Sequence, residues 1–414
     1  MKSDNILKKS SNEYFHKICV VGGGLTGAIM TLLLKKSNLF KSHEIGWIKP
    51  KIRDSKDIRT TFYNKKSLDL LHSLDVLKNF DITDYAFINK IQVFGVNNSS
   101  PLEWDYSDPK LNFGAVIKND IVLKSVTEQL SDIKHYESFV TNTQHDEFER
   151  TLYLNNKVLI KTHLVLSADG KNSNLRRLLS IKTLQKKVNH IALSGFLQQS
   201  KNHNSTAVQA FTDLGPIGLL PFQSKNIINF VQSIEEKKCK QILSKSKPEQ
   251  YICDHLNSFF SHIDLKFKPL KKVNNINNKL SSWKLDLNFI VNPTAYRTIL
   301  IGDAAHSIHP LAGQGLNLAL RDCSSVIKSL ENNLKFGNDL GDTSILNFYK
   351  EDRLPKTIAM TAITDFLFYG FTSKSKKTQS LLTKGMETLN QSDLKNIFKA
   401  VSYTHLTLPT ILLV

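Results

Sequence analysis

The run from Ile301 to Asp322, IGDAAHSIHPLAGQGLNLALRD, limits what this chain can fold into more than any other segment. The apolar residues 298–301 predict a buried strand. Gly302 then allows a turn that lets the Asp303 carboxylate face a ligand. Ligands of open α/β sheets bind beyond the carboxyl ends of the strands, so this arrangement predicts a binding site.

The second half of the run predicts a helix whose first turn favours negative charge. Gly313 and Gly315 open this helix, which continues from about Leu316 through Asn317. The first backbone N–H groups of a helix have no partners within it, and the helix dipole adds positive potential there. We therefore expect the helix start to hold an anionic group.

A glycine-rich turn near the amino end supplies a second binding element. Residues 18–21 predict a buried strand and residues 28–36 a helix, with Gly22, Gly24 and Gly27 between them in GxGxxG spacing. In this setting the first glycine makes the tight turn, the second lets a pyrophosphate approach, and the third packs the helix on the strand. The sequence therefore predicts a dinucleotide site.

One residue expected of such a site is missing. A carboxylate normally ends the second strand and binds the adenosine ribose, but the predicted strand Glu44–Ile48 is followed by Lys49. Glu44 at the start of the strand and Asp54 beyond its end are candidate substitutes. The other alternative is that backbone and basic groups hold the adenine end.

Composition narrows the class of protein. The 414 residues exceed one ordinary domain, and a hydrophobic content of 41% supports a real core. No apolar run approaches the ~18–20 residues of a membrane span, and the amino end lacks a signal pattern, so we expect a cytoplasmic protein. The net charge of +18 is nearly all lysine spread along the chain, without a nucleic-acid motif, so we expect no nucleic-acid partner. The four cysteines lack metal or disulfide spacing, and neither His306 nor His309 has a carboxylate at ligand spacing, so we expect no metal.

Together with the run Ser167–Arg176, SADGKNSNLR, the two motifs resemble the three flavin motifs of aromatic-ring hydroxylases similar to p-hydroxybenzoate hydroxylase. The run His309–Leu318, HPLAGQGLNL, resembles more narrowly the ubiquinone-biosynthesis hydroxylases of that group. The resemblance covers roughly residues 16–400. It departs from the family at Lys49, at Ser167, and in the strand 229–233, which lacks a tryptophan.

The resemblance implies FAD as cofactor and assigns roles to residues. Asp303 would accept a hydrogen bond from the ribityl chain, and Arg59 would offset the diphosphate charge. The residues expected at the cofactor are Gly22, Gly24, Gly27, Arg59, Asn119, Asp169, Gly302, Asp303, Gly315, Leu316 and Asn317. The flavin-pocket loop would include Pro310, Leu311 and Gly313, and the substrate would meet Pro216, Leu220 and Pro221.

The implied fold is α/β, with a Rossmann-like GxGxxG FAD-binding domain interleaved with a strand-rich substrate domain. We expect the FAD-binding domain at 16–81, 110–180 and 278–350, and the substrate domain at 82–109 and 181–277. Helices should occupy 351–400, where the apolar residues 360–369 either pack on the FAD-binding domain or line an entrance for a prenyl tail. Residues 1–15 should be disordered, and 401–414 are an atypical tail.

The implied reaction is hydroxylation of a polyprenylated phenol in ubiquinone biosynthesis with NAD(P)H and O2. No side chain supplies electrophilic oxygen, whereas reduced flavin does, through a C4a-hydroperoxide. No general base is assigned. Two alternatives stay open: a flavin hydroxylase of another aromatic or a polyketide, and a catalytically silent flavin-binding subunit of a quinone-biosynthesis complex. Peripheral contact with the inner face of the membrane also fits, because ubiquinone precursors reside in the bilayer and the chain is basic.

Overall fold

The computed structural model describes residues 12–51, 59–96, 101–106, 108, 111–271, 279–309, 313–373 and 375–391. The strands are β1 (Glu13–Val21), β2 (Ile45–Lys49), β3 (Thr60–Asn64), β4 (Ala86–Ile88), β5 (Lys90–Phe94), β6 (Leu102–Asp105), β7 (Gly114–Lys118), β8 (Lys134–Glu137), β9 (Val140–His145), β10 (Arg150–Leu154), β11 (Leu159–Ser167), β12 (Leu184–Gln199), β13 (Thr206–Thr212), β14 (Gly215–Phe222), β15 (Ile227–Glu235), β16 (Phe267–Pro269), β17 (Ser281–Phe289), β18 (Thr294–Ala295), β19 (Thr298–Leu300) and β20 (His306–Ser307). The α-helices are α1 (Leu25–Lys36), α2 (Lys65–Ser73), α3 (Asn119–Glu128), α4 (Asn174–Leu178), α5 (Glu236–Leu243), α6 (Pro248–Phe259), α7 (Gln314–Leu334), α8 (Thr343–Phe371) and α9 (Lys376–Gln391).

One sheet of the described residues carries the dinucleotide-binding topology. Its main path runs β18-β19-β11-β1-β2-β8, and β10 and β9 extend from β11. The five strands from β19 to β8 pair in parallel. β1 leads through α1 to β2 on one side and has β11 on the other, so the chain after β1 begins at a switch point of the strand order. That is where such sheets bind dinucleotides.

Helices cover this sheet because apolar side chains of the central strands face them. Ile18 and Val20 of β1 are fully buried in one cluster with residues of α1, α3, α7 and the start of α8. This cluster brings α7, from the late motif, against α1, from the early motif. The two motifs therefore meet although about 290 residues separate them.

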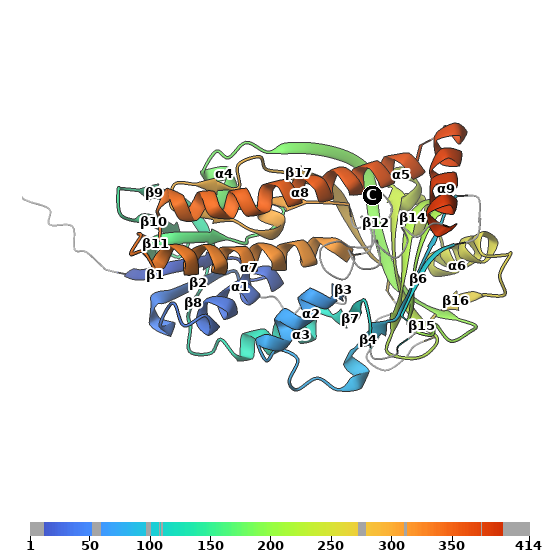
Figure 1. The fold of residues 1–414 in the computed structure, drawn as a ribbon, viewed down its shortest axis with the longest axis horizontal. Coiled ribbons are helices and arrows are strands. Elements are labelled where there is room, and N and C mark those ends of the chain that lie inside the picture. The colour runs from blue at the N-terminus through green and yellow to red at the C-terminus, as the bar shows by residue number, and fades with distance from the viewer. Residues whose placement is uncertain are drawn as a thin grey trace, which may run out of the picture.

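The second sheet has the order β20-β17-β12-β15-β14-β13-β5-β6, with β16 paired to β12. Helices α5 and α6 pack on one face through Cys239, Ile242 and Leu256. Figure 1 shows the two sheets at opposite ends of the long axis, with α8 spanning from one to the other. β17 lies in the range 278–350 that we assigned to the FAD-binding domain, yet it pairs with β12 in this second sheet. The chain therefore returns from the second sheet to the first only after β17, later than we expected.

The apolar segment 360–369 packs against the second sheet and also contacts the dinucleotide-binding half. Leu367 and Phe368 are buried in a cluster with Trp104, Phe211 and Leu220 from that sheet. The same cluster contains Phe62 and Val116, from ranges that we assigned to the FAD-binding domain, so the first of our two alternatives, packing on that domain, holds in part. The reason is that α8, at 29 residues, is long enough to leave the first sheet and continue across the second.

Other helices are close to expectation. α1 and α7 begin within three residues of their predicted starts. The sequence also predicts helices over 120–130 and 65–80. α3 begins one residue before the first of these, whereas the second ends early, because α2 stops at Ser73 and Asp75 takes a positive φ of 57°. Turns then carry the chain through residue 80.

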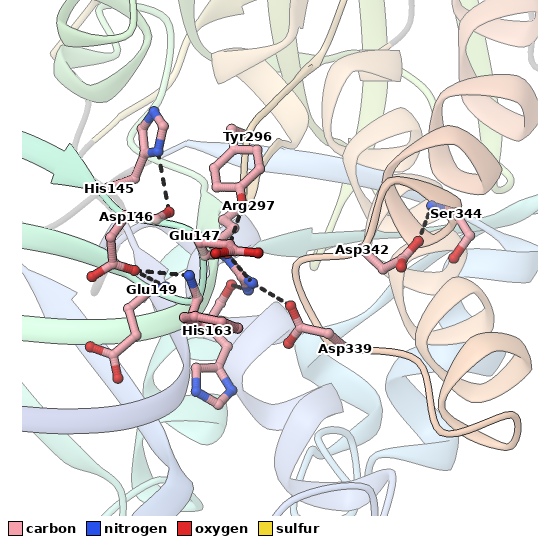
Figure 2. A network of polar contacts seen from close by, with 11 residues as sticks. His145, Asp146, Glu147, Glu149, His163, Tyr296, Arg297, Asp339, Asp342 and Ser344 are labelled. Carbon is pink, nitrogen blue, oxygen red and sulfur yellow. Dashed lines mark hydrogen bonds and ion pairs between the residues drawn. The ribbon is translucent and has the colours of Figure 1, made fainter.

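A polar network fastens the outer edge of the first sheet. Arg297, 3% exposed, donates to the carbonyl oxygens of Glu147 and His163 and pairs with Asp339 (Figure 2). Tyr296 also donates its hydroxyl hydrogen to the Glu147 carbonyl at 2.6 Å. This network ties the β9–β10 hairpin to the segment between α7 and α8, so it supports the sheet from the side.

Among the described helices, none combines the length and the apolar character needed to cross a bilayer. The predictions for residues 1–11 and 401–414 lie outside the described part of the chain.

Candidate cofactor and substrate site

A cavity of about 630 Å³ lies between the two sheets. Its walls come from both halves, so it joins the predicted dinucleotide motifs to the face of the second sheet. The dinucleotide half contributes Gly24, Arg59, Asn119, Asp303, Gly313, Gly315 and Leu316, and the second sheet contributes Ser194, Gln209, Gly218, Leu220, Trp283 and Leu287.

The three motif glycines after β1 divide into two kinds. A Cβ on Gly22 would lie 2.1 Å from the Ala168 carbonyl oxygen, and one on Gly27 would lie 2.2 Å from that of Gly22. These two glycines therefore allow close packing within the protein. Gly24 has nothing within 4 Å of its Cβ position and lines the cavity. It leaves the space that a pyrophosphate requires.

Asp303 is presented to the cavity by the turn after β19. Gly302 has a positive φ of 57°, and its N–H donates to Asp322 at 2.9 Å. The Asp303 side chain is exposed to the cavity, and it makes no hydrogen bond to any described residue. The surrounding protein still removes much of the solvent from this carboxyl group. This burial raises the pKa of Asp303, although His306 and Arg59 act in the opposite direction. The carboxylate is therefore an acceptor that lacks a hydrogen-bond partner among the described residues.

The start of α7 is open to the same cavity. Gly313 caps the helix in the left-handed conformation, with φ 67°, and Gly315 has nothing within 4 Å of its Cβ position. Leu316 also lines the cavity. The side chain of Asn317 is used within the protein: its amide donates to the Phe62 carbonyl at 2.7 Å and accepts from the N–H of Asn64 at 3.0 Å. Asn317 thus fixes β3 beside the helix start.

Arg59 and Asn119 reach the cavity from β3 and α3. The Asn119 side chain is buried and accepts from the Thr61 hydroxyl at 2.7 Å, while its backbone N–H donates to the Arg59 carbonyl at 3.0 Å. These bonds hold the two predicted cofactor residues side by side, and the cationic Arg59 is placed where it can offset anionic charge.

The motif 167–176 has a bracing role in the structure. Both carboxylate oxygens of Asp169 are engaged, by the Ser167 hydroxyl at 2.7 Å and by the backbone N–H groups of Asn174 and Leu175. Arg176 donates to the Ala304 carbonyl at 2.8 Å, which docks the motif on the turn that carries Asp303. Asp169 does not line the cavity, whereas its neighbours Ala168 and Gly170 do.

Beneath Asp303 lies a buried ionic network that we did not anticipate. Asp322 is fully buried and contacts His306 at 2.6 Å and Arg353 at 2.7 Å. Burial alone would raise the pKa of Asp322, but His306 and Arg353 lower it to about 2. Because Asp322 also accepts from the Gly302 N–H, the network fixes the turn that presents Asp303. The sequence signal that was available is Asp322 itself, the last residue of the late motif.

Lys49 occupies the end of β2, as predicted. Its ammonium lies 4.3 Å from the centroid of the Trp47 ring, and burial lowers the pKa of Lys49. Glu44 sits at the opposite end of the strand, paired with Lys17 at 2.7 Å and bonded to the N–H of Lys41. It is therefore not a substitute for the ribose carboxylate, and Asp54 lies outside the described residues.

On the substrate side the structure separates the predicted residues. Leu220 lines the cavity, whereas Pro216 and Pro221 are buried in β14 and do not line it. Pro310 and Leu311 lie outside the described residues. Two cavity residues that sequence reasoning missed are Gln209 and Trp283, whose side chains reach the cavity through strand alternation that no motif marks.

His309, just before the flavin loop, was also left without a role. It is fully buried, stacks on Phe368 of α8 at 3.9 Å and lies 3.4 Å from Asp365. Burial, Lys186 and His190 lower the pKa of His309 to about 3. The neutral ring thus anchors the start of that loop to the helix that packs on the second sheet.

Fold and site together define a flavin-type dinucleotide-binding protein. Two open glycines, an unpartnered carboxylate and a helix start converge on one cavity, and this donor and acceptor set fits FAD. A family model described as FAD binding domain matches residues 16–364. The chain belongs to this FAD-binding family.

Relatives that are named as monooxygenases align with nearly the whole chain. The ubiquinone biosynthesis monooxygenase COQ6 of Dictyostelium discoideum is 26% identical, over 95% of this chain and 92% of the relative. Human COQ6 is 26% identical, over 92% and 91%. Two solved structures share the fold: PqsL, a probable FAD-dependent monooxygenase from Pseudomonas aeruginosa, has a TM-score of 0.70 at 17% identity over 87% of this chain and 97% of that one. HpxO of Klebsiella pneumoniae, complexed with FAD and uric acid, has a TM-score of 0.70 at 13% identity over 94% and 96%. The chain is an FAD-dependent monooxygenase by class.

Proposed function

We propose that this chain hydroxylates the ring of a polyprenylated phenol in ubiquinone biosynthesis, using FAD, NAD(P)H and O2. The observation that carries the proposal is the shared cavity, in which flavin-binding motifs meet an apolar wall from the second sheet. Such a cavity holds a ring beside a flavin and keeps water away from both. The ubiquinone step comes from the relatives, which are named ubiquinone biosynthesis monooxygenases and align with 95% and 92% of this chain.

The protein's part in the reaction is binding, orientation and shielding. Bound FAD supplies the activation of O2 that no side chain can provide. Asp303 would accept from the ribityl hydroxyls, and Gly24 with Arg59 would receive the diphosphate. The open N–H groups at Gly313–Leu316 would stabilise negative charge on the reduced ring, since they are oriented before the reaction begins. We propose Pro310, Leu311 and Gly313 as the loop facing that ring.

On the other side, Leu220 and its neighbours would hold the substrate ring. Trp283 and Leu287 add apolar surface to this wall, which suits an aromatic with a hydrocarbon tail. The surfaces of α8 and α9 expose Ile358 (47%), Phe366 (49%) and Leu381 (72%). Exposed apolar side chains on a basic chain support peripheral contact with the membrane that holds such substrates, and the same surface suits a quinone-biosynthesis complex.

Three measurements test the proposal. Protein refolded with FAD should show flavin absorbance, and it should consume NAD(P)H faster when a candidate phenol is added. Expression should rescue a quinone-deficient strain that lacks its ring hydroxylases. Rescue failure with phenol-stimulated turnover intact would point to another aromatic or a polyketide as substrate. Partner binding without NAD(P)H consumption would identify a silent flavin-binding subunit, a role consistent with Lys49 at the ribose position.

Mass spectrometry of the quinone intermediate that accumulates on deletion would identify the ring position. An intermediate that lacks one hydroxyl group is expected. An unchanged quinone profile would count against a place in this pathway.

A further inference from the structure

The apolar wall of the cavity contains one polar side chain whose hydrogen-bonding capacity is unused. Gln209 lies in the middle of β13 and lines the cavity. It is 7% exposed, and its Nε2 has no hydrogen-bond partner among the described residues. A buried amide donor without a partner costs about 1–3 kcal/mol, so such a group in a binding cavity calls for a ligand atom.

The neighbours of Gln209 leave it free to meet a ligand. Its partner across β14 is Gly218, which has no side chain and also lines the cavity. Even a Cβ at Gly218 would stay 3.7 Å from the Gln209 Oε1 atom, so the space beside the amide is open. The rest of this wall is largely hydrocarbon, including Leu220 and Leu287.

The amide donors of two other side chains in this region are already used by the protein. The Asn229 amide donates to the Gly195 carbonyl at 3.1 Å and accepts from the Thr60 hydroxyl at 3.1 Å. Gln232, fully buried in the same sheet, donates to the Thr212 hydroxyl at 3.2 Å, has an Oε1 atom without a partner among the described residues, and does not line the cavity. Gln209 differs from both because its donor faces the cavity region without a partner.

We propose that Gln209 orients the aromatic substrate by donating a hydrogen bond from Nε2 to an oxygen substituent on the ring. In an apolar pocket such a bond fixes rotation of the ring within its plane. Gln209 thereby selects which ring carbon is turned toward the flavin motifs on the opposite wall. It is a specificity-determining residue, and the inference rests on the proposed function for the aromatic nature of the ligand.

A pair of matched probes isolates this bond. 4-Propylanisole carries a ring oxygen, and 1-ethyl-4-propylbenzene has a methylene in the same place. Affinity of both for the FAD-loaded protein is measured by calorimetry. The wild-type protein should prefer the ether about 3- to 10-fold, the range of one net neutral hydrogen bond.

The variants decide what produces the preference. Gln209→Leu removes the donor, and Gln209→Met also lacks a donor while keeping a similar length, so both variants should bind the two probes equally. Gln232→Leu is the matched control, with the same exchange in the same sheet away from the cavity, and it should retain the preference. Equal wild-type affinity for the two probes, including no measurable affinity for either, overturns the inference. So does a preference that survives in Gln209→Leu or Gln209→Met. Flavin absorbance and NAD(P)H consumption of the wild-type protein report separately on the proposed function.

Discussion

Replacing Asp303 with alanine should move cofactor affinity and apoprotein stability in opposite directions. The carboxylate has no hydrogen-bond partner among the described residues and faces the cavity. Its proposed bond to the ribityl chain is charge-assisted, worth about 1.5–3 kcal/mol. Losing it should weaken FAD binding about 10- to 150-fold.

The stability effect has the opposite sign because burial raises the pKa of Asp303 in the folded protein. A carboxyl group whose pKa is raised on folding destabilises the folded state at pH values above that pKa, where it is ionised. Asp303→Ala should therefore stabilise the apoprotein at neutral pH, and the gain should disappear as the pH falls and the wild-type carboxyl becomes protonated. The side chain opens on the cavity, so solvent screening keeps the gain below about 1 kcal/mol.

Flavin fluorescence titration measures the FAD dissociation constant, and urea unfolding of the apoprotein measures the free energy of unfolding. Asp286→Ala is the control, because Asp286 also lines the cavity but is paired with Lys171 at 2.8 Å. That variant should gain no stability and should change FAD affinity less. An Asp303→Ala protein with unchanged FAD affinity, or a less stable apoprotein, would refute the reasoning.

Three further substitutions test other parts of the site. Lys49→Glu places an acceptor where the ribose hydroxyl is expected and should tighten FAD binding by about 1 kcal/mol; weaker binding in the same titration would show that the lysine already holds the adenosine diphosphate. Asp169→Ala removes the carboxylate that binds two N–H groups at the start of α4, so urea unfolding should show a loss of about 0.5–2 kcal/mol, with a smaller change in FAD affinity than Asp303→Ala gives. Asp322→Asn should cost about 3–5 kcal/mol, because it leaves the buried cation of Arg353 uncompensated. The pKa of Asp322 falls on folding from 3.8 to about 2, so its contribution is complete above about pH 4 and is lost as the pH falls toward 2; unfolding across that range should be steeper in the wild-type protein than in the variant.

Sequence reasoning was strongest where a local pattern sets the backbone. The strands and helices around Gly22–Gly27 and Gly302–Leu316 are those that the spacing predicted, since turn glycines and buried strands are dictated locally. The assignment of β17 to the wrong half and the early end of α2 are failures of another kind. Strand partners depend on segments far away in the chain, and no pattern within residues 281–289 indicates β12.

Side-chain roles were less predictable because a motif marks position but not partners. Asp303, Asp169 and Asn317 stood together as expected cofactor residues. In the structure Asp169 accepts hydrogen bonds from α4 and Asn317 donates one to β3. Of the three side chains, only the Asp303 carboxylate has no hydrogen-bond partner among the described residues. Residues such as Asp169 and Asn317, which bond to the protein, hold the walls of the cavity in place. A residue such as Asp303, which does not, is available to a ligand.

The difference between polar groups that bond to the protein and polar groups that do not also identifies a candidate functional residue outside the motifs. Gln209 has no sequence signature, yet like Asp303 it lines the cavity with polar capacity that the fold does not use. An unsatisfied polar group near the core destabilises the fold, so it is retained where a ligand satisfies it. Asp303 and Gln209 come from opposite halves of the cavity, one from the turn after β19 and the other from β13. Their positions therefore divide the cavity into a cofactor side and a substrate side, and the alanine and leucine variants should impair the binding of different molecules.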